Sequence, residues 1–375
     1  MATGATDEYW QREALPGVYK HALLRRYLPV FGGKTGSHSR EVVFLDGYAG
    51  RGRHADGTPG SAELILQTAE SQAHAGISWR CFFFETDPGS YRILEKVVDE
   101  YVQRGVATES ENSEVEPRLG DVLKIADGLP LFLFLDPCGL GLPYDTLVKT
   151  LNAPSRRSKP TEVLLNFSME AVRRIGGHIT STKGNEATLR RLDDAVGGDW
   201  WRTYFEAGEH DPDGMVAEFV TRLARDTNMG VRAFPVRRAP HHKPIYYLVF
   251  GTRSNHGVWA ISDSAAKAAD EWRERHAEDK NIEGTLFDIE QEMALEKLDA
   301  DAIPDIAANI ERLITEHDQF RVLDYPTEIL GSHVGEVRNA AVRKAIKRLY
   351  EQGKITSYKK GLKIEELIIT RPEIR

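Results

Sequence analysis

Residues 46–52 read Asp-Gly-Tyr-Ala-Gly-Arg-Gly and follow the apolar run 42–45. The apolar run predicts a buried strand that delivers the acid Asp46 at its end. Glycines after such a strand let the backbone approach a ligand closely and adopt positive φ without steric cost, which concerns Gly47, Gly50 and Gly52. Together these residues predict the first turn of a site for a nucleotide-containing cofactor.

A second acid follows a second apolar run. The run 131–135, Leu-Phe-Leu-Phe-Leu, is followed by Asp136-Pro137-Cys138-Gly139. Its uninterrupted apolar character is typical of a strand buried on both faces, and the proline fixes the backbone of the turn. The sequence thus predicts that Asp136 sits at the end of a core strand.

Two more carboxylates follow candidate strands. Glu85 ends the strand expected at 79–84, and Asp121 ends a weak strand expected near 117–119. Because the carboxyl ends of parallel strands meet at one edge of a sheet, we expect these two acids to lie beside Asp46 and Asp136. Four strand-end acids at one edge favour a binding site over four unrelated surface charges.

The charge of Asp46 distinguishes between cofactors. A dinucleotide loop places pyrophosphate at a helix N-terminus, where an acid would add negative charge beside an anion. The carboxylate of Asp46 suits instead the ammonium group of a methionine moiety. The sequence therefore favours S-adenosylmethionine over NAD, with Glu85 accepting from the ribose hydroxyls and Asp121 lying near the adenine amino group.

The turn 136–139 has several chemical readings. An acid followed by proline can accept a hydrogen bond from an exocyclic amino group and align its lone pair with the methyl group. Amino-methyltransferases usually carry an aromatic residue at the place of Gly139, so stacking would come from Tyr144 or Phe167. The turn also resembles that of tRNA guanine-N2 methyltransferases. The pair Pro137-Cys138 leaves open a nucleophilic cysteine, as in cytosine C5 methylation, against the simpler reading of a small buried thiol.

Other polar groups have weaker assignments. His241 and His242 are adjacent and point in different directions, so we predict no metal site there. Arg173 and Arg174 follow the strand expected at 162–167 and could bind a phosphate or simply begin a charged helix.

The elements that must position these residues alternate between strands and helices. This alternation predicts an α/β fold with a doubly wound, mostly parallel sheet of the Rossmann-like, class I methyltransferase type. Two strands at 231–237 and 246–252 would complete seven, the last antiparallel, after a helical insertion at about 175–230. We expect this domain to span 1–262 and a charged helical connector to span 263–303.

The C-terminal residues 304–375 predict a separate basic domain. A helix over 335–352 precedes a hairpin expected at 355–364 with its turn at Lys360-Gly361, the pattern of a winged helix. Residues 331–375 hold 11 Lys and Arg against 5 Asp and Glu, while residues 1–330 carry a net charge of −14. This asymmetry predicts a polyanion partner for the tail. The cations expected to bind nucleic acid are Arg338, Arg343, Lys344, Lys347, Lys359 and Lys360.

Composition limits the class of protein. A chain of 375 residues with 41% hydrophobic content can bury a large core and form two units. No stretch approaches 18 consecutive apolar residues, and the N-terminus lacks a signal-peptide pattern, so we expect no membrane span and no secretion. The two cysteines, Cys81 and Cys138, fit neither a disulfide framework nor a zinc cluster, which favours the cytoplasm.

The chain resembles the three-Cys-motif partner family, methyltransferase-like proteins encoded beside radical S-adenosylmethionine proteins. The resemblance covers roughly residues 15–255. It is carried by Lys20, Tyr27-Leu28, the segment 46–52, Gly60-Ser61, Phe84-Glu85, the Leu-Asp-Pro-x-Gly of 135–139, and 164–167. It implies S-adenosylmethionine as the cofactor and adds Lys20, Ala49 and Ser61 to the residues that hold it. Cys138 departs from the pattern, because that position is usually aromatic in the family.

Two functions are compatible with these residues. The first is an S-adenosylmethionine-dependent methyltransferase that acts on DNA or RNA, with a base amino group as the acceptor. The second is a non-catalytic, nucleic-acid-binding partner of a radical S-adenosylmethionine three-Cys-motif protein, for instance in DNA repair. The glycine at position 139, where a stacking aromatic would be expected, motivates the second.

Overall fold

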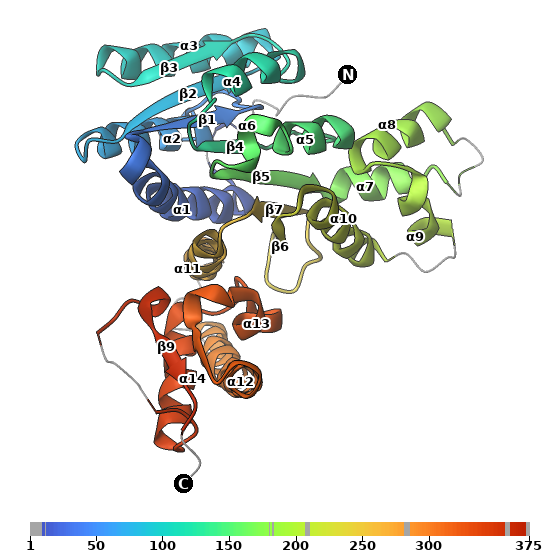
Figure 1. Ribbon diagram of the computed structural model, residues 1–375. Helices are drawn as coiled ribbons and strands as arrows, with labels where there is room; N and C mark the ends of the chain where they lie inside the picture. Colours follow the sequence, from blue (N-terminus) through green and yellow to red (C-terminus); the bar gives the residue numbers. More distant parts are fainter. Residues whose placement is uncertain are drawn as a thin grey trace. The chain divides into compact units, whose positions relative to one another are not determined.

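The computed structural model divides the chain into two compact units, Met1–Arg253 and Ser254–Arg375 (Figure 1). The boundary expected at residue 262 falls inside a helix of the second unit. No helix among the described residues is long and apolar enough to cross a membrane. The structure describes residues 10–11, 13–179, 181, 184–206, 211–280, 286–356 and 361–372.

The first unit is built on one seven-stranded sheet with the order β3-β2-β1-β4-β5-β7-β6. The strands from β1 to β5 pair in parallel, and β7 is antiparallel to both β5 and β6. The predicted doubly wound, mostly parallel sheet is therefore confirmed, including its antiparallel final strand. The strands are β1 (Glu41–Asp46), β2 (Ser78–Phe84), β3 (Ala107–Glu111), β4 (Leu131–Leu135), β5 (Thr161–Ser168), β6 (Gly230–Val236) and β7 (Tyr246–Thr252).

Helices cover both faces of this sheet (Figure 1). Side chains alternate between the faces along a strand, so Phe44 and Phe132 point toward α1 while their neighbours Leu45 and Leu133 join the core on the other face. The helices are α1 (Leu15–Ser39), α2 (Ser61–Ala73), α3 (Pro88–Gln103), α4 (Leu119–Ile125), α5 (Tyr144–Leu151), α6 (Pro154–Arg157), α7 (Met169–Gly176), α8 (Glu186–Val196), α9 (Thr203–Glu206) and α10 (Pro212–Thr227). The expected helical insertion at about 175–230 corresponds to the end of α7 and to α8–α10, with the 3₁₀ helix Asp199–Arg202 between α8 and α9.

Helix α1 continues through a pair of glycines. Gly32 and Gly33 both lie inside Leu15–Ser39, although glycine commonly ends a helix. A Cβ at Gly32 would lie 2.5 Å from the indole of Trp79, so the glycine permits close packing of α1 on β2 and does not end the helix.

The third strand was placed wrongly. Residues 117–119 lie in the 3₁₀ helix Glu116–Arg118 and at the start of α4, and the strand is β3, Ala107–Glu111. The sequence Ala-Thr-Glu-Ser-Glu has no apolar run, because β3 is an edge strand whose side chains are half-buried or exposed. Hydrophobic patterning cannot identify a strand of this kind.

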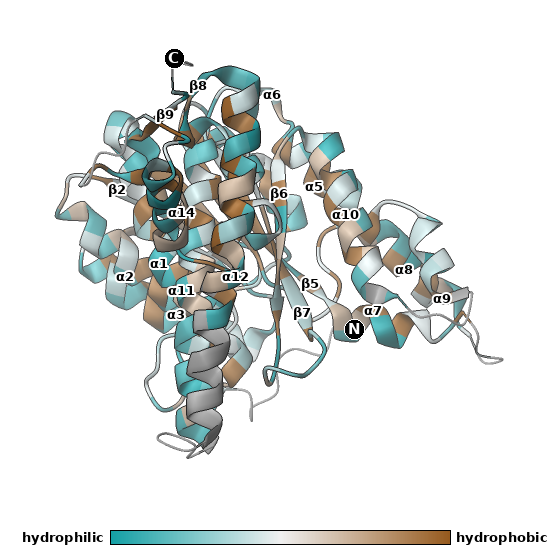
Figure 2. Cartoon of the chain, turned by 90° about the horizontal axis from the view of Figure 1, so that it is seen from below, coloured by the Kyte–Doolittle hydropathy of each residue, from teal (hydrophilic) through white to brown (hydrophobic). Residues whose placement is uncertain are grey.

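The second unit packs its own core around two helices, α12 (Leu286–His317) and α14 (Asn339–Glu351). In Figure 2, the coloured part of α12 alternates between brown and teal residues, as an amphipathic helix does. Residues 263–303 are not merely a connector, since Ala302 of α12 is buried in this core beside Trp259 of α11. The other elements are α11 (Asn255–Lys280), β8 (Gln319–Arg321), α13 (Pro326–Leu330) and β9 (Ile368–Thr370), with 3₁₀ helices Val322–Asp324, Gly331–His333 and Ile364–Glu366.

The predicted hairpin at 355–364 is wrong in its second strand. Residues 364–366 form a 3₁₀ helix, and the strand that follows, β9, pairs with β8. Residues 357–360, which include Lys359 and Lys360, lie outside the described residues. Ile364 is buried in the core of this unit, so the apolar side chain that indicated a strand marks an anchoring turn instead.

Candidate active site

The loop after β1 is tied to both neighbouring strands. The backbone N–H of Gly47 donates to the carbonyl of Phe134 on β4 over 3.0 Å, and that of Ala49 donates to Phe84 on β2 over 2.9 Å. Gly50 and Gly52 take φ values of +62° and +75°, which non-glycine residues rarely adopt. The predicted glycine loop is thus a fixed turn over the carboxyl edge of the sheet.

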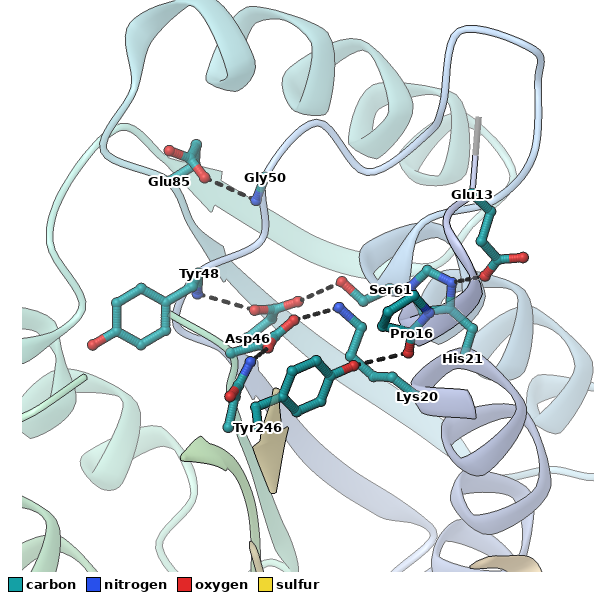
Figure 3. A network of polar contacts seen from close by, with 12 residues as sticks. Glu13, Pro16, Lys20, His21, Asp46, Tyr48, Gly50, Ser61, Glu85 and Tyr246 are labelled. Atoms are coloured by element: carbon teal, nitrogen blue, oxygen red, sulfur yellow. Dashed lines mark hydrogen bonds and ion pairs between the residues drawn. The ribbon is translucent and has the colours of Figure 1, made fainter. Parts of the chain in front are cut away.

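Glu85 holds this loop from β2 (Figure 3). One of its oxygens accepts from the Gly50 N–H at 2.8 Å, and the other accepts from the Asp87 N–H at 2.7 Å. Each carboxylate oxygen has two lone pairs, so Glu85 keeps acceptor capacity for a pair of hydroxyl groups. Its position after β2 is the predicted one.

Asp46 is fully buried at the head of the loop. It accepts from the Tyr48 N–H at 3.0 Å and lies 3.5 Å from the Ser61 hydroxyl. Burial raises the pKa of Asp46 to about 7. The Tyr48 N–H and Lys20 oppose this rise in pKa, whereas the charge of Asp136 reinforces it. A cationic ligand would stabilise the ionised form of this buried carboxyl group.

Asp136 is held by side chains from two other elements. Its Oδ2 lies 2.5 Å from Lys20 Nζ of α1, and its Oδ1 accepts from Asn166 Nδ2 of β5 at 2.7 Å. Lys20 was expected among the cofactor-binding residues. Its ion pair is with Asp136, and its positive charge also opposes the rise in the pKa of Asp46.

The turn after Asp136 borders an apolar cavity. Cys138 is exposed, so the buried-thiol reading of this residue is wrong. A Cβ at Gly139 would meet no atom within 4 Å. The cavity has a volume of about 50 Å³, and Pro137, Gly139, Asn166 and Phe167 are among the residues that line it.

The two candidate stacking residues have different environments. Phe167 lines the cavity and packs against Phe219 with ring centroids 4.7 Å apart. Tyr144 is buried in α5 and donates its hydroxyl to Asp226 at 2.8 Å. Of the two, Phe167 is therefore the one placed to contact an acceptor group.

Asp121 does not occupy the predicted position. It lies on α4 and not at the end of a strand, and its carboxylate pairs with Arg118 at 3.3 Å and Lys124 at 3.1 Å. The residue that follows β3 is Asn112, whose side-chain amide donates to the Glu85 carbonyl at 2.7 Å. The misplaced strand explains the error.

Three contacts escaped the sequence reasoning. Trp10, from the segment before α1, packs so closely on Gly50 that a Cβ there would lie 2.5 Å from its ring. The buried His21 is hydrogen-bonded to Glu13 beside the same loop (Figure 3). Asn166 was noted for the family resemblance but was not assigned to the site. An amide at the end of the apolar strand β5 is the signal that could have identified it.

The basic residues predicted in the second unit are partly engaged within it. Arg338 pairs with Asp270, and Arg343 donates to the carbonyl of Leu362 at 2.7 Å. Lys344 and Lys347 are exposed on α14, with Lys347 3.5 Å from Glu351. Contact of these residues with nucleic acid stays a prediction. Among the described residues, no group of three or more His, Cys, Asp or Glu could hold a metal ion.

Comparisons with known proteins return structural likeness only. No protein-family profile and no curated protein matches the sequence. The small RNA methyltransferase HEN1 is 10% identical, with 63% of this chain and 25% of that chain aligned at a TM-score of 0.35. Trm1 from Pyrococcus horikoshii, solved with S-adenosyl-L-methionine, is 10% identical over 67% of this chain and 58% of its own, at a TM-score of 0.34.

The methyltransferase domain of the bacterial protein CtHen1-CN is 11% identical, with 62% of this chain and 99% of that domain aligned at a TM-score of 0.31. The chain spans a quarter of the HEN1 length. The fold assignment rests on the chain's own strand order, and membership of the three-Cys-motif partner family stays a prediction.

Proposed function

We propose that the chain is an S-adenosylmethionine-dependent methyltransferase that acts on nucleic acid. The observation that carries this proposal is the carboxyl edge of the sheet. There the glycine loop after β1 is hydrogen-bonded to β4, to β2 and to Glu85 after β2. Asp136 follows β4 at the same edge and is held by Lys20 and Asn166. Methyl transfer requires a loop that admits the cofactor, an acid that binds its ribose and an acid that orients the methyl acceptor. The glycine loop, Glu85 and Asp136 would fill these roles.

The residues present fit this cofactor. Asp46 is a buried acid whose side-chain oxygens receive only neutral N–H and O–H donors among the described residues, so an ammonium group would complete its environment. Glu85 would accept from the ribose hydroxyls, and Gly47, Gly50 and Gly52 would allow close approach of the backbone. The cofactor supplies an activated methyl group on a sulfonium. The protein's part is to position the acceptor and stabilise its charge.

The residues around the cavity suit an amino group as the acceptor of the methyl group. Asp136 keeps free lone pairs on both oxygens. Asn166 Oδ1 is buried at the cavity with no donor among the described residues. These two hydrogen-bond-accepting side chains lie beside apolar side chains of the cavity. They suit a planar group that carries N–H donors, such as the edge of a base. The acceptor's lone pair would be aligned by these hydrogen bonds.

The second unit supports a nucleic acid as the partner. Its element order α12-β8-α13-α14-β9, with β8 paired to β9, is compatible with a winged helix that presents α14. Lys344 and Lys347 on α14 would contact phosphates, which gives affinity without sequence information.

One observation favours the non-catalytic alternative. Both oxygens of Asp136 already accept hydrogen bonds from within the protein, and Gly139 provides no stacking ring. In that case the chain would bind nucleic acid and recruit a radical S-adenosylmethionine three-Cys-motif protein.

Calorimetry with S-adenosylmethionine tests the cofactor. Wild type should bind. Glu85→Ala should bind more weakly, because it lacks the carboxylate that would accept from the ribose hydroxyls and that holds the Gly50 N–H. Absence of wild-type binding at millimolar ligand would exclude the cofactor. Transfer of a labelled methyl group to total DNA and RNA, lost in Asp136→Ala, would exclude the non-catalytic alternative.

A further inference from the structure

The connection between β6 and β7 is basic and lies at the same sheet edge as the candidate site. Residues 237–243 read Arg-Arg-Ala-Pro-His-His-Lys and contain no acid. Because β7 is antiparallel to both β5 and β6, β6 ends at the edge where β5 ends. Ser168, the last residue of β5, lines the cavity beside the Asp136 turn. The basic connection thus begins and ends next to that cavity.

This connection is held in place by α7. Arg173 donates from Nη1 to the carbonyl of Pro244 at 2.8 Å, and Glu170 pairs with Arg238 at 2.7 Å. Ala239 is buried, so the middle of the connection is anchored while the residues after it are exposed. The contacts with α7 therefore fix the part of the surface on which the cations of this connection lie.

Helix α7 adds another cation to this surface. Val172 lines the cavity, and Arg173 and Arg174 follow it directly. Residues three and four apart share a helix face, so Arg174 lies on the same face as Glu170, which contacts the connection through Arg238. Arg174 is exposed.

Three of these cations have no paired acid among the residues that the structure describes. Among the described residues, no side chain or carbonyl forms an ion pair or hydrogen bond with the side chains of Arg174, Arg237 or Lys243. The nearby acids are already engaged, Glu170 with Arg238 and Asp213 with the hydroxyl of Tyr247. Burial raises the pKa of Tyr247, and the positive charges of Arg237 and Arg173 oppose that rise.

We propose that Arg174, Arg237 and Lys243 form a phosphate-binding rim that holds the backbone of a nucleic acid beside the acceptor cavity. The three cations come from a helix and from a loop, an arrangement that suits a chain of phosphates. They stand out because residues 1–330 carry a net charge of −14. The inference rests on the proposed function, since that function places the acceptor base in the cavity.

The test uses the full chain and fluorescence anisotropy with labelled, mixed-sequence single-stranded RNA and single-stranded DNA. Replacing Arg174, Arg237 and Lys243 together by Gln should reduce the slope of log affinity against log salt by roughly two units, at about 0.7 per lost contact on a single strand. S-adenosylmethionine affinity, measured by calorimetry on the same protein, should not change.

A matched control removes the same charge elsewhere on the first unit. Lys149, Arg157 and Lys159 are exposed and lie between the last turn of α5 and the start of β5, at the opposite sheet edge. Their replacement by Gln should leave the slope unchanged. Both triple variants are also measured in a Lys344→Ala/Lys347→Ala background, which removes the lysines of α14.

The outcomes separate the rim from the proposed function. An unchanged slope in the rim variant, an equal loss in the control, or no binding of either oligonucleotide by wild type would overturn the rim. Each can occur while S-adenosylmethionine still binds. If the wild-type protein does not bind S-adenosylmethionine, the proposed function itself is overturned.

Discussion

At the scale of single residues, Asp46 couples cofactor binding to pH. Its pKa is raised to about 7 because it is buried, so part of the population is protonated near neutrality. A bound ammonium would favour the ionised form and lower that pKa. Binding then releases a proton, and affinity should rise by up to about tenfold per pH unit as pH rises toward about 7, and should level off above it.

Calorimetry in two buffers of different ionisation enthalpy would detect this released proton. In Asp46→Asn, the amino group of the ligand still titrates but the carboxyl group at position 46 is absent. This variant should bind S-adenosylmethionine weakly, and its affinity should depend less on pH. The same proton release in wild type and Asp46→Asn would exclude Asp46 as the coupled group.

The Lys20–Asp136 pair is a second prediction at this scale. Both side chains are largely buried, with 7% and 13% of their surface exposed. Lys20→Met would leave the carboxylate without its cation, and loss of one member of a buried pair costs about 3 kcal/mol or more. Denaturant unfolding should show this loss.

Asp136→Asn in the Lys20→Met background should restore part of the stability, since the unpaired charge is then removed. If Lys20→Met unfolds at the wild-type denaturant concentration, the ammonium contributes nothing to holding Asp136 in place.

At the scale of elements, a buried carboxyl ties α1 to the sheet. Glu162 of β5 accepts from Tyr27 of α1 at 2.6 Å and from Thr252 of β7 at 2.8 Å. Burial raises the pKa of Glu162 to about 7 from an ordinary value of 4.5. The folded state therefore holds this proton more tightly than the unfolded state does. Its contribution to stability is full below pH 4.5 and is lost as pH rises toward 7.

Glu162→Gln should abolish this pH dependence. The free energy of unfolding of wild type should include a component that falls between pH 4.5 and 7 by up to about 1.4 kcal/mol per pH unit. Denaturant unfolding across that range should give a shallower fall for the variant. Parallel curves for the two proteins would show that Glu162 does not titrate there.

At the scale of the whole molecule, charge divides the chain into an acidic majority and a basic C-terminal region. If α14 binds phosphates, replacing Lys344 and Lys347 by Ala should reduce the salt slope of duplex binding by roughly two units, at about 0.9 per contact. Cofactor affinity should stay constant, because both lysines belong to the second compact unit. An unchanged slope would assign this unit a structural or dimerising role.

The sequence by itself determined the central strands and the acids they deliver. The runs 42–45, 81–84 and 131–135 are apolar because these strands are covered on both faces, and that burial is visible in residue type alone. Asp46, Glu85 and Asp136 could therefore be placed at one sheet edge without coordinates.

Only the tertiary structure decided where the edge of the sheet lies and which side chains meet. The strand β3 is polar because one of its sides has no neighbour, so its sequence looks like a loop and Asp121 was assigned to it wrongly. The ion pair of Lys20 with Asp136 joins residues 116 positions apart. The ion pair of Glu170 with Arg238 in the 237–243 connection likewise depends on how β7 returns beside β5. Local patterns report burial and periodicity. Long-range contacts are set by packing, which no local pattern records.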